Sequence, residues 1–418
     1  MSTRIRIRVR MSARPIDEPH RASSQLELLF DLVFVVAVAA ATAQLAHHIA
    51  DGHAWTGLAG FLQVFFAIWW AWMNFTWFAS SYDTDDVAYR LLTMVQMAGV
   101  LVLAAGVPAT ATGDYRAVAA GYLVMRIGLV AQWLRAGLED PARRRTAFRY
   151  AAGITVLQIG WVGWLVLGET GVLSPGTRTV CFLALAAAEL AVPRWAERPG
   201  ATTWHPHHIA ERYGLFTIIL LGESVSAAIT GVRGVLQAAE ISAAFVTIAV
   251  SGLVLLFATW WLYFLEPAGD GLRDRREGSY LWGYGHFGTF AALATLGASL
   301  EVAVEDTGHH LPASPLLISY AVAASVGVFL VLLWLIHVPI VARTVLRPGA
   351  VLACATVVFL LPLAAPWTGV AVVVAGIATA CALLVAFTIT RELSHAAGRS
   401  CLHWQRDHDD PRRTGGMP

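Results

Sequence analysis

The sequence predicts an all-α fold, a polytopic membrane bundle of about twelve transmembrane helices. Hydrophobic residues make up 57% of the chain and charged residues only 14%, whereas about 25% charged residues is typical of globular domains. Apolar runs of roughly 20 residues recur between short polar breaks, and a helix of that length crosses a hydrocarbon core about 30 Å thick. Because the runs are continuously apolar instead of alternating, helices are favoured over the strands of a barrel.

Each predicted span lies between polar breaks. The first begins near Leu26, after an arginine-rich start that lacks the adjoining short apolar segment of a secretory signal. The break at residues 80–86 is acidic, with Asp83, Asp85 and Asp86. The expected spans are residues 26–46, 55–79, 87–108, 115–136, 150–168, 177–195, 213–232, 241–265, 280–303, 315–340, 349–365 and 368–390.

The distribution of arginine predicts the orientation of the chain. All 29 basic residues are arginines, and short basic loops stay on the cytoplasmic side of a bacterial membrane. An even number of spans places both basic termini in the cytoplasm, with few arginines in the loops of the opposite side. The chain therefore divides into a basic segment 1–25, a six-helix half 26–196, a second six-helix half 197–393 and a disordered cytoplasmic tail 394–418.

An internal repeat is indicated when the first half is shifted by about 191 residues onto the second. Residues 68–72, Ile-Trp-Trp-Ala-Trp, then align with residues 259–263, Thr-Trp-Trp-Leu-Tyr, and Asp31 comes within one position of Glu223. Because six helices precede the second copy, the two copies would cross the membrane in the same direction. A chance match between two tryptophan-rich apolar segments is the alternative.

Two acids lie deep in apolar sequence, Asp31 in the first span and Glu223 in the seventh. An ionised carboxylate in hydrocarbon costs at least about 3 kcal/mol, so such a group usually faces a cavity, a partner or an ion path. Glu27 lies one helical turn before Asp31 and points the same way, and Glu301 and His286 lie in the ninth span. These five residues are the candidates for ion or substrate binding, or for proton relay.

The structural alternative is that the acids form buried ion pairs that lock helices together. Arg126 is the one base expected at comparable depth, and Arg212 lies near the membrane boundary beside Glu211. We therefore assign Arg126, Glu211 and Arg212 to structural ion pairs. Removing one partner of a buried pair destabilises a protein strongly, so loss of function on mutation does not separate the two interpretations.

A histidine-rich segment precedes the seventh span and contains His205, His207, His208 and Glu211. On a helix, His208 and Glu211 share a face that is suited to Zn²⁺. Pro206 interrupts the segment, however, and a second set of ligands is absent from it. We therefore expect neither a metal site nor a cofactor.

Tryptophans cluster in the second and eighth spans, at Trp69, Trp70 and Trp72 and again at Trp260 and Trp261. Amphipathic indole rings are enriched where a membrane meets water, so an interfacial belt is the expected role. A cation-binding aromatic box is the alternative.

Three segments of the chain carry a family pattern. They are residues 27–34, Glu-Leu-Leu-Phe-Asp-Leu-Val-Phe; residues 208–224, which include Glu-Arg and Leu-Gly-Glu-Ser; and Tyr-Gly-His-Phe at 284–287 with Leu-Glu-Val at 300–302. Together they resemble the bacterial low temperature requirement A family (LtrA) over roughly residues 24–390. The resemblance implies a multi-spanning membrane protein of a family named for a growth defect in the cold, and it implies no defined activity. The positions carried over are Glu27, Phe30, Asp31, His208, Glu211, Arg212, Gly222, Glu223 and His286.

Three classes of function fit these observations. The first is a transporter or channel for a cation or small solute, with proton coupling through intramembrane carboxylates as an option, because acids at repeat-related positions suit a central site. The second is a membrane component that supports growth at low temperature without transport, and it predicts tolerance of Asp31→Asn and Glu223→Gln. The third is an intramembrane enzyme acting on lipids, for which the sequence offers no convincing nucleophile or metal set.

We expect the first class, and hence no enzymatic activity. The expected partners are the lipid bilayer and a cation or small solute, with no nucleic acid. The expected location is the bacterial plasma membrane, crossed several times, with both termini in the cytoplasm. The sequence predicts neither the solute, nor the coupling ion, nor the oligomeric state.

Overall fold

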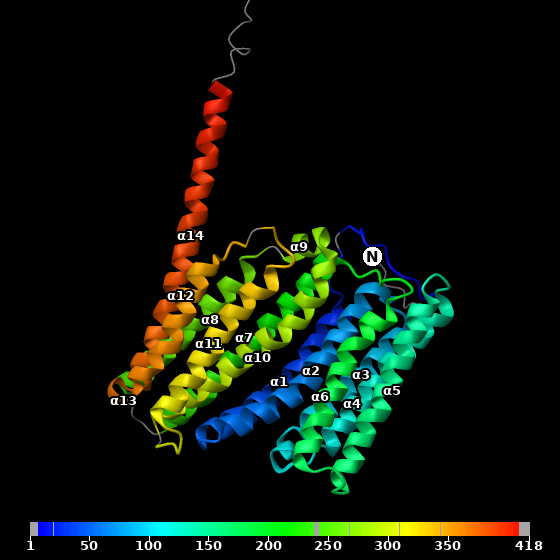
Figure 1. Cartoon of the computed structure of the whole chain (residues 1–418), viewed down its shortest axis with the longest axis horizontal. Helices are drawn as coiled ribbons and strands as arrows, with labels where there is room; N and C mark the ends of the chain where they lie inside the picture. Colours follow the sequence, from blue (N-terminus) through cyan, green and yellow to red (C-terminus); the bar gives the residue numbers. More distant parts are fainter. Residues whose placement is uncertain are drawn as a thin grey trace, which may run out of the picture.

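The computed structural model describes residues 7–19, 21–237, 242–266, 268–308, 310–342 and 344–408. All regular secondary structure in these ranges is helical (Figure 1). Eleven helical segments of the described chain are long and apolar enough to cross a membrane. The predicted all-α bundle of transmembrane helices is therefore confirmed.

The first half contains six long helices that correspond to the first six predicted spans. A short 3₁₀ helix, Pro108–Thr112, follows the third of them. The six helices are α1 (Gln25–Ala50), α2 (Ala54–Tyr82), α3 (Val87–Gly106), α4 (Arg116–Glu139), α5 (Arg144–Glu169) and α6 (Pro175–Ala196).

The second half contains the helices of the other predicted spans and two short helices. The predicted span 213–232 lies within the first of these helices, which begins earlier and is not one of the eleven apolar segments. The helices are α7 (Pro206–Gln237), α8 (Ala243–Phe264), α9 (Ala268–Asp274), α10 (Ser279–Glu305), α11 (Pro315–His337), α12 (Pro348–Leu360), α13 (Ala365–Thr368) and α14 (Val370–His408).

Side-chain caps explain where several helices begin. The Ser24 hydroxyl accepts the Glu27 amide and the Glu27 carboxylate accepts the Ser24 amide, which forms a capping box at α1. Asp86 caps α3. Ser174 and Ser314, each followed by a proline in the first turn, cap α6 and α11. These polar breaks in the sequence are therefore helix starts.

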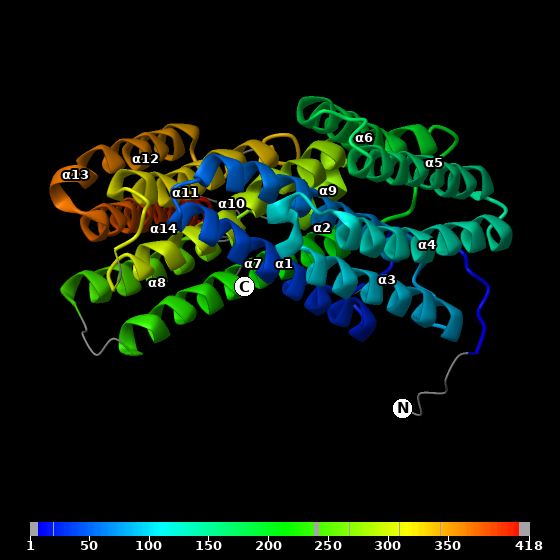
Figure 2. The same cartoon turned by 90° about the horizontal axis from the view of Figure 1, so that it is seen from below.

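Helix α1 lies at the centre of the bundle. It contacts α2 and α3 of the first half and α7, α10 and α11 of the second. Figure 2 shows α3–α6 on one side and α8 and α11–α14 on the other. Helix α3 contacts α1 and α4, and α10 contacts α7 and α11 in the same order. This correspondence is compatible with a repeat, which stays a prediction together with its boundaries.

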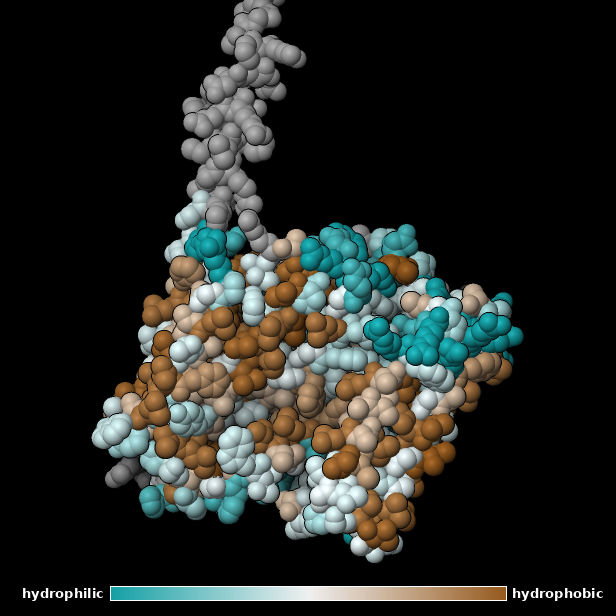
Figure 3. Space-filling model, viewed as in Figure 1, coloured by the Kyte–Doolittle hydropathy of each residue, from teal (hydrophilic) through white to brown (hydrophobic). Residues whose placement is uncertain are grey.

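Both described ends of the chain lie at the same end of the bundle (Figure 1). We call this the N-terminal end and the opposite one the distal end. Hydrophilic residues gather at the N-terminal end, and hydrophobic residues cover much of the surface below it (Figure 3). This surface fits a protein that lies in a membrane, while the side of the membrane that each end faces stays a prediction.

The C-terminal tail begins as a helix. Helix α14 continues through residue 394, where we expected a disordered tail to start, and ends at His408. The remainder of the predicted tail, residues 409–418, lies outside the described residues.

The tryptophans of α2 do not form an interfacial belt, contrary to the prediction. Trp69, Trp70 and Trp72 are at most 1% exposed. Trp70 and Trp72 donate their indole N–H groups to buried carboxylates. An indole ring that packs and also donates one hydrogen bond is suited to a helix interface that contains an acid. Trp260 and Trp261 of α8, by contrast, are 44% and 43% exposed.

Glycines allow α3 and α4 to approach closely. A Cβ atom added to Gly121 would lie 2.4 Å from the amide nitrogen of Leu103 and 2.5 Å from the carbonyl oxygen of Gly99. Both are backbone atoms, so the neighbouring helix itself would have to move. Small residues at this interface therefore set the distance between the two helices.

Gly121→Ala is expected to lower the melting temperature of the purified protein in detergent, because the added methyl group forces α3 and α4 apart. Gly163→Ala in α5 is the matched control. Nothing lies within 4 Å of its added Cβ, and alanine favours a helix over glycine by about 0.5–1 kcal/mol. A Gly121→Ala protein that melts at or above the temperature of Gly163→Ala would contradict this packing.

Candidate functional site

Arg212 of α7 and Asp31 of α1 form a bidentate ion pair. Arg212 donates from Nε to Oδ2 at 2.9 Å and from Nη2 to Oδ1 at 2.6 Å. Trp72 of α2 donates its indole N–H to Oδ1 at 2.7 Å. All three side chains are buried, where hydrogen-bonded charges attract more strongly than in water. The pair therefore holds three helices together.

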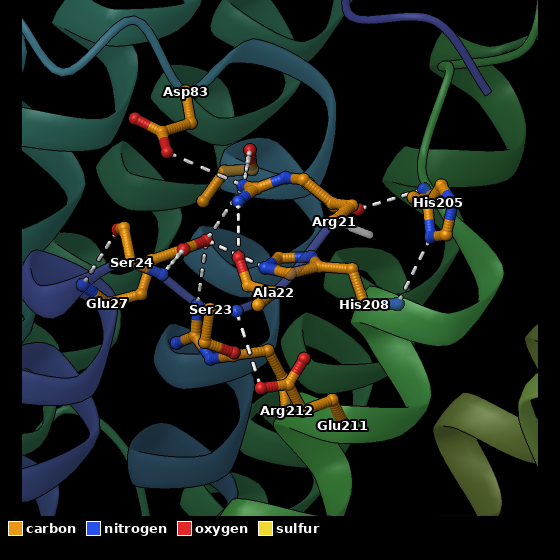
Figure 4. A network of polar contacts seen from close by, with 12 residues as sticks. Arg21, Ala22, Ser23, Ser24, Glu27, Asp83, His205, His208, Glu211 and Arg212 are labelled. Carbon is orange, nitrogen blue, oxygen red and sulfur yellow. Dashed lines mark hydrogen bonds and ion pairs between the residues drawn. The ribbon is translucent and has the colours of Figure 1, made fainter. Parts of the chain in front are cut away.

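Glu27, one turn before Asp31, gathers three further groups (Figure 4). Its Oε1 lies 3.1 Å from Nη1 of Arg212, 3.0 Å from Nε2 of His208 and 3.3 Å from Nη2 of Arg21. Its Oε2 completes the capping box of α1. The residue that caps α1 therefore also joins it to the start of α7. We call Arg21, Glu27, Asp31, His208 and Arg212 the α1–α7 network.

The N-terminal segment closes over this network. Arg21 is buried, and its Nη2 also lies 3.5 Å from Oδ2 of Asp83 at the end of α2. Further back, Met11 is fully buried, and its amide donates to Glu139 of α4 at 2.6 Å. The segment thus ties the ends of α2 and α4 to α1.

Only part of the histidine-rich segment reaches the network. His208 contacts Glu27, and its amide donates to Nδ1 of His205 at the start of α7. Glu211 was predicted to form an ion pair, but the one interaction seen in the described chain is a hydrogen bond from the Ser23 amide at 3.4 Å (Figure 4). Within the described ranges, no group of three or more His, Cys, Asp or Glu side chains is arranged to hold a metal ion.

A second buried network surrounds Glu189 of α6. Trp70 of α2 donates to its Oε2 at 2.8 Å, and Trp161 of α5 and Tyr122 of α4 each donate to its Oε1 at 3.1 Å. Arg126 of α4 lies 3.4 Å from Oε2 and also donates to the Tyr122 hydroxyl. One carboxylate therefore connects four helices. We call these five residues the Glu189 network.

Arg126 and Arg212 each form the buried ion pair that the structural alternative expected of them. We expected Arg126 to be the deep base available to Asp31 and Glu223, but it pairs with Glu189. Arg212, expected near the membrane boundary, pairs with Asp31. Because α7 begins six residues before Arg212, this side chain projects from a helix into the bundle instead of lying in a loop.

Asp31 and Glu223 do not meet in this structure. Glu223 comes about 16 Å further along α7 than Arg212, the residue that binds Asp31, at 1.5 Å per residue. Helix α7 packs instead against α10, which contains Glu301. In the described part of the chain, neither Glu223 nor Glu301 has an ion pair or a hydrogen bond to its carboxylate. The two half-buried acids therefore lie on contacting helices without a counter-ion among the described side chains.

His286 of α10 is held between aromatic rings. Its Nδ1 lies 2.7 Å from the carbonyl oxygen of Trp282 and its Nε2 lies 3.1 Å from the hydroxyl of Tyr263. Since a carbonyl oxygen only accepts, Nδ1 carries the proton and Nε2 accepts from Tyr263. The rings of Tyr213 and Phe290 pack against it. This geometry is that of a neutral packed histidine, and a role in proton relay stays a prediction.

Three cavities follow one another along α2. The distal cavity lies between α1, α2 and the 3₁₀ helix and is lined in part by Gln44, His48 and Thr56. The middle cavity lies between α2, α4, α5 and α6 and shares Gln63 and Tyr115 with the distal one. The proximal cavity, at the N-terminal end, is lined mainly by aromatic residues of α2, α4, α5 and α10. The space inside them amounts to about 230 Å³ in the distal cavity, about 50 Å³ in the middle one and about 40 Å³ in the proximal one.

The Glu189 network separates the middle cavity from the proximal one. Tyr122 and Trp161 line the middle cavity, Trp70 lines the proximal cavity, and all three bind Glu189. Phe66, which lines the middle cavity, stacks on Trp70 with 6.2 Å between ring centroids. These residues form the partition between two cavities.

The three cavities together have the length of a membrane crossing. Their lining on α2 begins at Thr56 in the distal cavity and ends at Trp77 in the proximal one. At 1.5 Å per residue this is about 32 Å, close to the thickness of a bilayer core.

The sequence is similar to those of known proteins. Residues 22–388 match the sequence profile of the bacterial low temperature requirement A protein (LtrA). The chain belongs to the LtrA family. It is similar to the uncharacterized protein RA0937 of Rhizobium meliloti (strain 1021), with 31% identity over 280 residues. That match covers 62% of this chain and 64% of the length of the relative.

The residues that carry the LtrA resemblance meet in space. Glu27 and Asp31 come from one motif segment and His208 and Arg212 from another, and the four form most of the α1–α7 network. Phe30, between the two acids, is buried against other aromatic rings. The two motif segments that contain these four residues are therefore joined by a contact between α1 and α7.

The Glu189 network was not predicted. Glu189 is an acid in an apolar span, the same signal that singled out Asp31, but it lies outside the motif segments. The tryptophans on neighbouring spans were a second signal in the sequence that could have indicated the Glu189 network. Which of them meet Glu189 depends on the rotation of four helices, which hydropathy does not define.

Asp31→Asn is expected to destabilise the folded protein by about 3–5 kcal/mol, because Arg212 loses its bidentate partner inside the bundle. Replacing both residues, as Asp31→Leu with Arg212→Met, should cost less than the single change, since no buried charge is left unpaired. Thermal melting of the wild type, Asp31→Asn and the double variant in detergent gives the order of their stabilities. A double variant less stable than Asp31→Asn would contradict this account of the pair.

Asp83 is expected to make stability depend on pH. Burial and the nearby Glu27 carboxylate raise the pKa of Asp83 to about 6, against the opposing effect of Arg21 and Arg14. The pKa of an unfolded aspartate is about 3.9, so between pH 6 and 4 the folded state binds a proton that the unfolded state lacks. The stability of the wild type relative to Asp83→Asn should therefore rise as the pH falls through this window, by up to about 1.4 kcal/mol per pH unit. A difference that stays constant with pH would contradict the raised pKa.

Proposed function

We propose that this LtrA protein is a transporter for a small solute, which passes along α2 between the helices of the first half. The observation that carries the proposal is the succession of three cavities along the length of one helix, interrupted by the Glu189 network. Membership of the LtrA family supports a multi-spanning membrane protein and leaves the solute open.

The partition is suited to gating because an ion pair holds it. A transporter opens its path to one side at a time, so the barrier must yield in response to its cargo. Separating Arg126 from Glu189 leaves a buried charge without a partner, which costs several kcal/mol. Opening is therefore favoured when a solute or a proton takes the place of the lost partner. The ion pair therefore links solute binding to opening of the partition. A partition made of apolar side chains alone would not provide this link.

The α1–α7 network supports this function from outside the path. Asp31 and Glu27 are both paired with Arg212, and the network joins the half that contains the cavities to α7 of the other half. We assign these residues to holding the two halves in register. The loss of transport expected from their mutation would then reflect lost structure.

Glu223 and Glu301 are the proposed coupling site. Two half-buried carboxylates without counter-ions, on helices that contact each other, are stabilised by a proton or a bound cation. Neither has a counter-ion among the described side chains, and both lie on helices of the second half, whereas the cavities are lined mainly by the first half and, in the proximal cavity, also by α10. Proton coupling in this protein would therefore act between the halves.

Ala119→Trp is expected to reduce solute flux at least tenfold, because Ala119 lines the middle cavity and an indole ring would fill it. Ala120→Trp is the matched control, since Ala120 is the next residue of α4 and is exposed. Flux is measured in proteoliposomes with a panel of H⁺, Na⁺, K⁺ and labelled carboxylates, amines and sugars.

Melting temperatures of both variants establish that they are folded. Equal flux through folded Ala119→Trp and Ala120→Trp would contradict the proposed path. Folded wild-type protein that moves nothing in the panel would contradict the transport function itself.

A further inference from the structure

We propose that Arg126 in the Glu189 network binds a solute that carries a carboxylate, an inference that rests on the proposed path. A carboxylate offers about four lone-pair positions. Glu189 accepts from Trp70, Trp161, Tyr122 and Arg126, so all of its acceptor positions are in use.

The donors of the network, by contrast, are in excess. Arg126 is buried, and its Nη2 alone makes hydrogen bonds, to Tyr122 and Glu189. Its Nε and Nη1 have no hydrogen-bond partner. An unpaired buried N–H group costs about 1–3 kcal/mol, and a guanidinium retains its charge at any ordinary pH. The network therefore lacks an acceptor, and a ligand that supplies one would be stabilised.

Arg126 is not among the lining residues of the middle cavity, but it contacts one of them, Tyr122. The guanidinium carbon of Arg126 is 4.5 Å from the centroid of the Tyr122 ring, and that ring lines the cavity. Gln158, also in the lining, is buried and its Oε1 has no partner either. Much of the remaining wall is aromatic or aliphatic, with Phe66 and Trp164 among its members. A small amphipathic carboxylate would place its charge at Arg126 and its apolar body against these rings.

A cationic solute fits this site less well. It would meet the positive charge of Arg126 and find Glu189 already saturated, and Gln158 is the buried lining residue whose acceptor oxygen has no partner among the described residues. A carboxylate competes with Glu189 for the guanidinium and can take over the ion pair. Because Nε and Nη1 are enclosed in this structure, the exchange also requires the partition to open. Binding and opening would then be one event.

Equilibrium dialysis of the full-length protein in detergent tests the inference, with radiolabelled phenylacetate as the probe. Benzylamine and benzyl alcohol are the cationic and neutral competitors of similar size. Phenylacetate should bind at least tenfold more tightly than benzylamine. Arg126→Gln should weaken phenylacetate binding at least tenfold, while Arg116→Gln, which changes an exposed arginine on the same helix, should leave it unchanged.

Glu189→Gln provides the second variant. It removes the charge that competes for Arg126, so phenylacetate should bind at least tenfold more tightly, and a gain of affinity cannot arise from misfolding. Tighter binding of benzylamine, or phenylacetate binding that neither variant alters, would overturn the inference.

The same measurements separate this inference from the proposed transport. Phenylacetate that binds as expected but is not moved into proteoliposomes would refute transport and leave the binding site. Flux of another solute that is blocked by Ala119→Trp, without binding of phenylacetate, would refute the carboxylate site alone.

Discussion

A charge buried among apolar helices must be matched by a partner on another helix, and this requirement organises the bundle. Arg212 and Arg126 are both buried, and each meets an acid that comes from a different part of the chain. Indole and phenol groups supply the remaining hydrogen bonds to these acids. The large aromatic side chains of α2 meet the same need, because Trp70 and Trp72 donate hydrogen bonds to the two carboxylates. Helices that have no hydrophobic drive to associate in lipid thereby acquire defined neighbours.

The two networks differ in how many acids their central arginine contacts. Arg212 makes a two-fold contact with Asp31 and a further one with Glu27, and the N-terminal segment covers the assembly. The Glu189 network has a saturated carboxylate, an arginine with free donors, and cavities on both sides. Contacts between Arg212 and two acids are suited to a fixed joint, and an arginine with unpaired donors beside empty space is suited to a site that exchanges partners. The first network therefore supports the structure in which the second one acts.

Hydropathy is a local property, so the all-helical bundle and the position of each span could be predicted from the sequence. The signal of an acid in an apolar span also selected Asp31 correctly as a buried group, and Arg212 as a structural partner. The pairing itself could not be predicted, because it depends on the rotation of α7 against α1. The same gap explains the wrong assignment of Trp69, Trp70 and Trp72, because interfacial and buried indoles have the same local sequence. Trp70 is held by contact with Glu189 and Trp72 by contact with Asp31, while Trp69 packs against other aromatic rings. The internal repeat and the role of Glu223 stay predictions.

The central claim is that water-filled space on α2 reaches the partition from both ends of the bundle and stops there. Cysteine accessibility measures this directly, with Gln63→Cys in the distal and middle cavities and Asn74→Cys in the proximal one, each in a cysteine-free background. Ile68→Cys, a fully buried position between them, is the control. A membrane-impermeant thiol reagent should label Gln63→Cys from one face of the membrane and Asn74→Cys from the other, and leave Ile68→Cys unlabelled. Labelling of both positions from the same face, or of neither from any face, would contradict the account.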